Sequence, residues 1–389
     1  MIPASPGIPL IAIACGGTGG HLFPGLAVAE QLKLHGCDVA LLISPKDVDQ
    51  QAVKSASGMA VFTLPAVGLQ NRNYFSFAGS FLKSLFAARN LFRQRQPEAV
   101  LAMGGFTSAP PIFAARNLGV RTFLHESNTI PGRANRLLAR FVDEAFVGFP
   151  ETAARLPARK VTPTGTPVRP QFHERAAAGC RAQLGLDGQR PTMLVVGGSQ
   201  GASGLNTMVL SALPLLGQKK WQWLHLTGPG DFEKVKAAYA GLGIAAVVKP
   251  FLAEMDLALG AATAAVSRAG ASSLAEIAAL HLPALLVPFP AAADNHQFFN
   301  ARIYEVSGAA RLVEQKDATP EMVADLLTEL MENDPVRDRM AAALKLWHTP
   351  DAAARIAANI LRPSSTAIGR SPPGDVTGGP VRPKNLSAV

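Results

Sequence analysis

Apolar and polar positions along the chain follow two alternating patterns. Short apolar runs, typical of strands buried in a parallel sheet, give way to stretches with apolar residues every three or four positions, typical of amphipathic helices. In the first half, this predicts strands at Leu10–Ala14, Val39–Ile43, Ala60–Leu64, Ala99–Met103, Thr122–Leu124 and Glu144–Val147, and helices at Pro24–Leu34, Gln50–Ser55, Phe77–Gln94, Ala109–Asn117 and Arg133–Phe141.

The second half repeats the scheme. It predicts strands at Thr192–Val196, Gln222–Leu226, Ala246–Lys249, Ala264–Ser267, Ala284–Val287 and Ala310–Leu312, and helices at Leu205–Leu213, Asp231–Tyr239, Met255–Ala261, Ser272–Ala279, Asn295–Tyr304 and Pro320–Met331. Strands that alternate with helices in this way predict an α/β protein with parallel sheets covered on both faces.

Two glycine-rich turns stand at matching places in the two halves. Gly16–Gly20 follows the first strand, and Gly197–Gly201 follows the strand that ends at Val196. A strand, a glycine turn and a helix start can cradle a phosphate, because glycine admits a close approach and the helix N-terminus offers N–H groups. The repetition predicts two Rossmann-like domains that face a central cleft.

The pattern breaks near Gly165, where two prolines follow within five residues. We therefore expect a first domain over residues 1–165, a second over 166–350, and a helix at 351–362 that crosses back onto the first domain. The Pro-, Gly- and Ser-rich residues 363–389 are interpreted as a disordered tail.

Composition narrows the class of protein. The 389 residues are 48% hydrophobic, enough for two packed cores. The three cysteines lack metal-ligand spacing, which favours reduced cytosolic thiols, and neither a secretory signal nor a transmembrane helix is expected.

Of the net charge of +9, residues 1–165 carry +7, from 16 basic and 9 acidic residues. This excess is either an ordinary solvated surface or a contact with an anionic membrane or another polyanion.

The first glycine turn fits neither common nucleotide motif. Counted from Gly17, the sixth position of the dinucleotide fingerprint is Leu22, and His21 stands where a P-loop requires lysine. His21 at the mouth of the turn is either a cap of local backbone or a base that accepts a proton from an incoming hydroxyl.

Seven segments, in order, resemble the MurG family of UDP-N-acetylglucosamine transferases. They cover about 300 residues, and as a set they are highly specific, although each alone is weak. They are Gly16–His21 with Pro24, Met103–Pro110, His125–Asn128 with Gly132, Asn135 and Arg136, Gly165–Arg169, Gly197–Ala202, Arg268–Glu276, and Asp294–Gln297 through Asn300 and Ala301.

The resemblance implies a B-type glycosyltransferase fold, with the donor held mainly by the second domain. It implies His21 as the catalytic base and Glu276 as the partner of the ribose hydroxyls. The full set implied for UDP-N-acetylglucosamine is Thr18, Gly19, Gly20, Asn128, Arg169, Ser199, Leu252, Ala271, Ser272, Ser273, Leu274, Ala275, Glu276 and Gln297, and the set for the acceptor is Gly104, Gly105, His125 and Glu126.

Three positions depart from the family's pattern, and one motif points elsewhere. Thr166, Ser127 and Phe106 replace the commoner Asn, Gln and Tyr, so acceptor contacts are less defined than donor contacts. Asp47-Val48-Asp49 has the Asp-x-Asp form of A-type metal sites, but acids are also favoured at a helix start, as expected here. No metal and no cofactor are expected.

The segment from Tyr74 to Arg95 combines Phe77, Phe81, Leu85 and Phe86 with Lys83, Arg89, Arg93 and Arg95. Such a helix is either a core helix or a face that docks on anionic lipid. The acceptor of the family is a polyprenyl-linked lipid, which suits a first domain that faces the membrane.

The resemblance implies inverting transfer of N-acetylglucosamine from UDP-N-acetylglucosamine to the muramyl 4-hydroxyl of lipid I, which gives lipid II in peptidoglycan synthesis. The expected place is the cytoplasmic face of the bacterial inner membrane, as a peripheral protein. Other cell-wall synthesis proteins are candidate partners, and nucleic acid is not. Two alternatives stay open: a lipid glycosyltransferase with another acceptor such as diacylglycerol, and a nucleotide-binding regulatory protein without catalysis.

Overall fold

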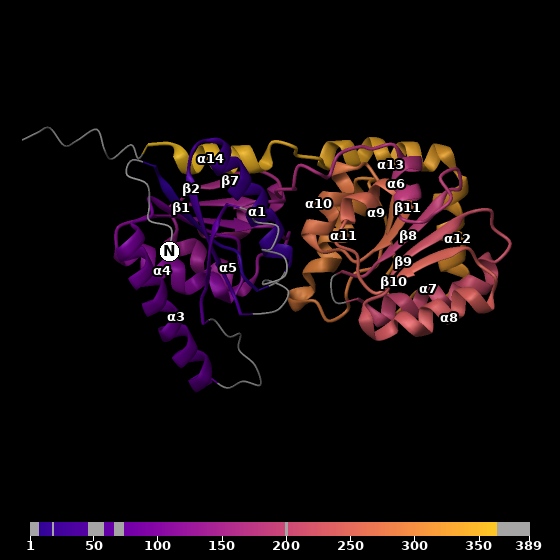
Figure 1. Ribbon diagram of the computed structural model, residues 1–389, viewed down its shortest axis with the longest axis horizontal. Helices are drawn as coiled ribbons and strands as arrows, with labels where there is room; N and C mark the ends of the chain where they lie inside the picture. Colours follow the sequence, from indigo (N-terminus) through magenta and orange to yellow (C-terminus); the bar gives the residue numbers. More distant parts are fainter. Residues whose placement is uncertain (1–7, 18, 46–57, 66–73, 199–200, 364–389) are drawn as a thin grey trace, which may run out of the picture.

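The computed structural model describes residues 8–17, 19–45, 58–65, 74–198 and 201–363. Figure 1 shows two lobes side by side, each with a sheet between layers of helices. The first lobe holds β1 (Leu10–Ala14), β2 (Asp38–Ile43), β3 (Ala60–Thr63), β4 (Ala99–Ala102), β5 (Arg121–Glu126), β6 (Glu144–Val147) and β7 (Val161–Pro163), with α1 (Gly19–Leu34), α3 (Tyr74–Arg95), α4 (Ala109–Asn117), α5 (Arg133–Leu138) and the 3₁₀ turns η2 (Phe106–Ser108), η3 (Ala139–Phe141) and η4 (Pro150–Arg155).

The second lobe is built in the same way. Its strands are β8 (Thr192–Val196), β9 (Gln222–Leu226), β10 (Ala246–Lys249), β11 (Ala264–Ser267), β12 (Ala284–Leu286) and β13 (Arg311–Leu312). Its helical segments are α6 (Ala177–Gln183), α7 (Ser203–Leu216), η5 (Pro229–Asp231), α8 (Phe232–Gly241), α9 (Met255–Ala261), α10 (Ala271–Ala279), η6 (Ala293–Asn295), α11 (His296–Val306), α12 (Pro320–Glu332) and α13 (Asp334–Trp347), and α14 (Ala352–Leu361) ends the described chain.

All strand pairs are parallel, and the two sheets have the same winding. The orders are β3-β2-β1-β4-β5-β6-β7 and β10-β9-β8-β11-β12-β13. In each sheet the direction of winding reverses beside the strand that precedes a glycine turn, β1 in one and β8 in the other. Such switch points are where doubly wound sheets bind ligands. The predicted pair of Rossmann-like sheets is confirmed.

The period of two along the strands separates the faces of the first sheet. Ile11 and Ile13 of β1 lie in one buried cluster with α1, and Ala12 and Ala14 lie in another on the opposite face. Both faces are covered, which explains why the strands are apolar almost throughout.

The carboxyl-terminal helix α14 lies over the first lobe, whereas α13 lies along the second (Figure 1). Four residues of α14 belong to the same buried cluster as β1 and α1: Ala353, Ile356, Ala357 and Ile360. The chain therefore passes between the lobes twice. The two passages touch, since a Cβ on Gly165 would lie 2.0 Å from Thr349 Oγ1.

Most predicted elements are present, with differences at some ends. α1 begins at Gly19, inside the glycine turn and five residues before the expected start, so that Pro24 lies within the helix. β7, α6 and α13 were not predicted from the sequence. The expected helix at 50–55 and the tail after residue 363 lie outside the described residues.

Candidate active site at the junction of the two domains

His21 lies against the backbone of the second glycine segment of the first domain. A Cβ on Gly104 would lie 3.1 Å from His21 Nε2, and one on Gly105 would lie 3.2 Å from Cε1. Both glycines have left-handed backbones, with φ of +117° and +78°, which side chains rarely allow. Glycine here lets the imidazole rest on bare peptide, so the candidate base and two candidate acceptor residues are brought together.

The first glycine turn, which precedes His21, is hydrogen-bonded to the segment that follows β4. Thr107 Oγ1 donates to Gly16 O at 2.6 Å, and Ser108 Oγ donates to Gly104 O at 2.7 Å. A Cβ on Gly16 would lie 2.4 Å from Ser44 N, so the turn also packs closely on the end of β2. Thr18, which the resemblance assigns to the donor, is outside the described residues.

His125 faces the protein interior. It is fully buried at the end of β5, with Nε2 3.1 Å from Gly165 O and Nδ1 3.2 Å from Ser127 Oγ. Burial lowers its pKa to about 4, so the ring is neutral at pH 7. The ring of His125 thus contacts Gly165 in the connection between the domains, and its assignment to the acceptor stays a prediction.

Glu126 is also buried, and it organises the loop that follows it. One carboxylate oxygen accepts from the backbone N–H and side-chain amide of Asn128, and the other accepts from Gly132 N and Asn135 Nδ2. Burial raises the pKa of Glu126, and these four hydrogen bonds oppose the rise. In this arrangement Glu126 holds the loop that follows β5, and its direct contact with an acceptor stays a prediction.

Arg169 lies where both domains meet. Its guanidinium stacks at 4.2 Å from the ring centre of Phe23 in α1 and at 5.0 Å from that of Phe172, and one nitrogen is 3.9 Å from Glu276 Oε1. Its Nε is buried without a hydrogen-bond partner. The sequence predicted both residues for the donor, but it gave no sign that they contact each other.

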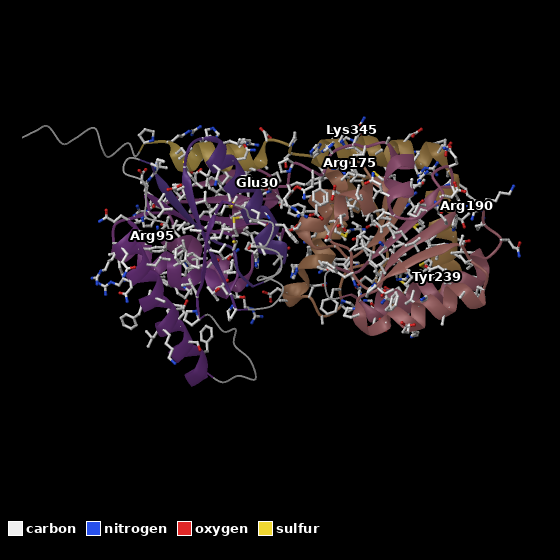
Figure 2. All side chains as sticks on the ribbon, viewed as in Figure 1. Glu30, Arg95, Arg175, Arg190, Tyr239 and Lys345 are labelled. Atoms are coloured by element: carbon white, nitrogen blue, oxygen red, sulfur yellow. The ribbon has the colours of Figure 1, made fainter. Side chains whose placement is uncertain are left out.

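The Glu276 carboxyl is mostly enclosed, with 15% of the side chain exposed. Burial raises its pKa to about 7, although Arg169 acts in the opposite direction. Figure 2 labels Glu30 on the first-domain side of this junction and Arg175, which pairs with Asp256 at 2.9 Å, on the second-domain side. Burial likewise raises the pKa of the Glu30 carboxyl. The carboxyls of Glu276, Asp256 and Glu30 thus all lie near the Arg169 guanidinium and raise its pKa against the effect of burial.

The N-terminus of α10 faces the first glycine turn. Ser272 Oγ donates to Gly20 O at 2.9 Å, across the two domains. In an α-helix Gly20 O would accept from residue 24, but Pro24 has no N–H. The first turn of α10 carries no acidic residue, and its backbone N–H groups suit an anion.

Three further donor candidates lie around the second sheet. Gln297 Oε1 accepts from Ala269 N and Phe289 N, which leaves its amide nitrogen for a ligand. The side chain of Leu252, just after β10, is buried, with 8% exposed. A contact with the uracil of the donor would therefore be made through the backbone of Leu252. Ser199 lies outside the described residues.

Metal ligands do not gather in the part of the chain that is described: it holds no group of three or more His, Cys, Asp or Glu residues suited to a metal. The pair Asp47 and Asp49 lies outside that part. Cys15, Cys37 and Cys180 are buried thiols outside any disulfide.

Helix α3 divides its apolar residues between two faces. Phe81 stacks edge-on against Phe113, 6.2 Å between ring centres, and Phe113 against Phe141 at 5.2 Å. On the other face Leu82 is 50% exposed and Phe86 57% exposed. Figure 1 shows the start of α3 extending away from the lobe. No helix within the described ranges is long and apolar enough to cross a membrane.

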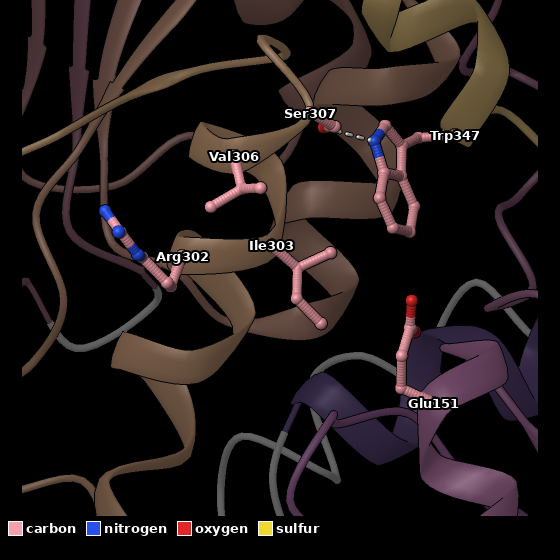
Figure 3. A pocket seen from close by; sticks show the side chains of 6 residues that line it. All are labelled: Glu151, Arg302, Ile303, Val306, Ser307 and Trp347. Atoms are coloured by element: carbon pink, nitrogen blue, oxygen red, sulfur yellow. Dashed lines mark hydrogen bonds between the residues drawn. The ribbon is translucent and has the colours of Figure 1, made fainter.

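A pocket of about 300 Å³ lies elsewhere on the junction (Figure 3). It is lined by Glu151 of η4, by α11 and by Trp347, whose Nε1 donates to Ser307 Oγ at 2.8 Å. None of the residues that the sequence assigns to donor or acceptor is among its described lining, so it is separate from the candidate site.

Known proteins match this chain over nearly its whole length. The glycosyltransferase family 28 N-terminal domain matches residues 11–147, and the family's C-terminal domain matches residues 192–356. A UDP-N-acetylglucosamine--N-acetylmuramyl-(pentapeptide) pyrophosphoryl-undecaprenol N-acetylglucosamine transferase of Anaeromyxobacter sp. (strain Fw109-5) is 38% identical over 96% of this chain and 99% of its own length. One of the same name from Lacticaseibacillus casei is 36% identical over 90% and 97%.

Solved structures also resemble this chain over most of its length. The crystal structure of Acinetobacter baumannii MurG superposes with a TM-score of 0.72 at 30% identity, over 91% of this chain and 99% of that one. A UDP-GlcNAc 2-epimerase from Neisseria meningitidis bound to UDP-GlcNAc superposes with a TM-score of 0.67 at 13% identity, over 91% and 100%, and shares the fold alone.

Proposed function

The chain belongs to glycosyltransferase family 28, among its MurG members, and on that premise we propose that it transfers N-acetylglucosamine from UDP-N-acetylglucosamine to lipid I. The product is lipid II, the disaccharide precursor of peptidoglycan. The observation that carries the proposal is the approach of the two halves: Ser272, at the N-terminus of α10, donates to Gly20 beside His21. A donor diphosphate at α10 would therefore lie next to the candidate base.

We assign the donor to residues 166–350. Glu276 would accept hydrogen bonds from the ribose hydroxyls, and Leu252 would meet uracil through its backbone. The N-terminus of α10 and Ser199 suit the diphosphate, and the amide nitrogen of Gln297 suits a sugar hydroxyl. Arg169, beside Glu276 at 3.9 Å, would add positive charge near the nucleotide.

The proposed chemistry is one displacement with inversion. His21 accepts the proton of the muramyl 4-hydroxyl while that oxygen forms a bond to the anomeric carbon. The bond from this carbon to the diphosphate breaks, and its electron pair leaves with UDP. An α-linked donor thus gives a β-linked product. Helix N–H groups and Arg169 would stabilise the negative charge that builds on the leaving diphosphate.

We assign the acceptor to residues 1–165, at Gly104 and Gly105 under His21. His125 and Glu126 would then act by shaping this loop, since both side chains are buried. Asn128 belongs with them, because its side-chain nitrogen donates to Glu126 and its side-chain oxygen accepts from Asn300.

We further propose that the exposed face of α3 rests on the cytoplasmic face of the inner membrane, where a lipid-linked acceptor resides. Exposed Leu82 and Phe86 would insert among the lipids, and Lys83 and Arg93 would meet anionic headgroups. This arrangement would keep the protein peripheral and turn His21's domain toward its substrate.

Release of UDP from UDP-N-acetylglucosamine separates the proposal from its alternatives. Lipid I should support turnover and diacylglycerol should not. Turnover with diacylglycerol alone would favour another lipid acceptor. UDP binding without turnover on either lipid would favour a regulatory protein.

A further inference from the structure

Asn300 of α11 is fully buried where the loop after β5 meets the loop after β11. Its side-chain oxygen accepts from Thr129 N at 2.9 Å. Its nitrogen donates to Asn128 Oδ1 at 3.0 Å and to Ala269 O at 3.2 Å. The first two partners belong to the first domain and the third to the second, so a single amide joins both domains to each other.

The orientation of this amide follows from its neighbours. Thr129 N–H can only donate, so the oxygen of Asn300 faces it. Asn128 gives its own nitrogen to Glu126, so its oxygen is the end left for Asn300. Every polar atom of the Asn300 side chain is thereby satisfied, as a buried amide requires.

On the first-domain side, the contacts lead to the base. Asn128 and Asn135 are both held by Glu126. Asn135 Nδ2 packs on Gly104, where a Cβ would lie 2.9 Å away, and Gly104 supports the ring of His21. On the second-domain side, Ala269 immediately precedes Gly270, the N-cap of α10. Asn300 thus lies between the loops that position His21, through Gly104, and helix α10, which we propose as the site of the diphosphate.

An ion pair on the rim reinforces the contact. Asp294, just before α11, accepts from Arg133 at 2.9 Å and from Arg136 at 3.3 Å, both in the first domain. Asp294 and Asn295 have φ of +50° and +53°, a left-handed conformation that costs energy outside glycine. The strained turn aims the carboxylate across the junction.

We propose, on the basis of the transfer reaction assigned above, that Asn300 is a positioning residue that couples the His21 loop to the donor helix across the two domains. Its amide fixes the distance and angle between the attacking hydroxyl and the anomeric carbon. It contacts no substrate. Without it the second domain still binds the nucleotide, but the two halves meet less often in the reactive arrangement, and water gains access to the donor.

The test is the variant Asn300→Asp, which keeps the oxygen for Thr129 N–H and replaces the donating nitrogen by an oxygen that faces two acceptors. We expect kcat with lipid I to fall about 10- to 100-fold, the range for a misplaced reacting group, with UDP affinity within about threefold of the unaltered chain. The ratio of donor hydrolysed to donor transferred should rise at least about fivefold, because closure excludes water.

Ser307→Ala is the matched control. It removes a hydrogen bond to Trp347 from the other end of α11, away from both substrates. It should leave the hydrolysis ratio unchanged. If Asn300→Asp matches this control in kcat and in the ratio, or if its UDP affinity falls in parallel with kcat, the coupling role is wrong.

Asn128→Ala supplies the second variant if Asn300→Asp does not fold. It removes the same interdomain bond from a half-buried position, and the same rise in the ratio is expected; an unchanged ratio would overturn the proposal. Absence of transfer by the unaltered chain would instead contradict the proposed function, so the two failures are distinguishable.

Discussion

At the scale of single residues, the proposed reaction depends on two glycines, Gly104 and Gly105, which leave room for the side chain of His21. Gly104 and Gly105 have no Cβ, and their left-handed backbones bring bare peptide under the His21 ring. A side chain at Gly104 would meet both His21 and Asn135. The identity of these glycines therefore follows from the place of the histidine.

His21→Ala should lower kcat by about 10²–10⁴, the range for loss of a general base, and leave UDP-N-acetylglucosamine affinity nearly unchanged. Steady-state turnover with lipid I and calorimetry with the donor give the two quantities. Turnover near that of the unaltered chain would exclude His21 as the base.

Glu276 should make donor affinity depend on pH. Its folded pKa is raised to about 7, so the carboxylate that we propose as the acceptor of the ribose hydroxyls is present above that pH and is lost below it. We expect UDP-N-acetylglucosamine to bind more weakly as the pH falls from 8 to 6, approaching about tenfold per unit below the pKa. Calorimetry across this range measures the slope.

Glu276→Gln is the control. It should flatten the pH dependence and weaken binding by roughly 1.5–3 kcal/mol at pH 8, the size of a charge-assisted hydrogen bond. An unaltered affinity and slope would remove Glu276 from the donor site.

The inward direction of His125 and Glu126 could not be predicted from the sequence. Both stand at the end of β5 beside apparent loop residues, as ligand-binding residues often do. Their burial depends on Gly165, Asn128, Gly132 and Asn135, which contact them only in the folded chain. The pairing of Arg169 with Glu276 is also a contact between distant segments.

At the scale of elements, apolar runs predicted the strands well because both faces of each sheet are covered. The ends of β1, β6, β8, β9, β10 and β11 agree with the expected ones. The predicted start of α1, at Pro24, was wrong, because proline is usually found in the first turn of a helix. Here Pro24 lies inside the helix, and Gly20 O accepts instead from Ser272 of the second domain, a contact between distant segments that the local pattern does not reveal.

Pro24→Ala tests this account of α1. An alanine N–H would bond Gly20 O within the helix and compete with Ser272. We expect thermal stability to stay equal or rise, since proline costs about 3 kcal/mol inside a helix, while kcat falls as the domains meet less firmly. A melting curve and a turnover assay report the two effects, and a parallel loss of both would show that Pro24 serves only packing.

At the scale of the whole molecule, charge is divided between the domains. Residues 1–165 carry a net +7 of the total +9. The apolar residues of α3 are in part core and in part surface: Phe81 packs on Phe113, whereas Leu82 and Phe86 are exposed. Periodicity could locate the helix but could not tell which face the rest of the domain covers.

Two variants of α3 separate charge from insertion. Changing Lys83 and Arg93 to Glu should reduce sedimentation with anionic vesicles at low salt, because each basic group contributes on the order of 1 kcal/mol near such a surface. Changing Leu82 and Phe86 to Ser should remove the part of the binding that resists salt. UDP affinity should not change in either.

Arg89 is left unaltered, since its Nε is buried. If both variants fold and sediment as the unaltered chain does, the membrane face lies elsewhere. If they unfold, the α3 surface is structural.

The most direct test of the central claim is the product formed from UDP-N-acetylglucosamine and lipid I by the purified protein. We expect one UDP released for each disaccharide lipid, and nuclear magnetic resonance should show N-acetylglucosamine joined to the muramyl 4-oxygen in the β configuration. An α-linked disaccharide, or UDP released together with free N-acetylglucosamine whether or not lipid I is present, would contradict it.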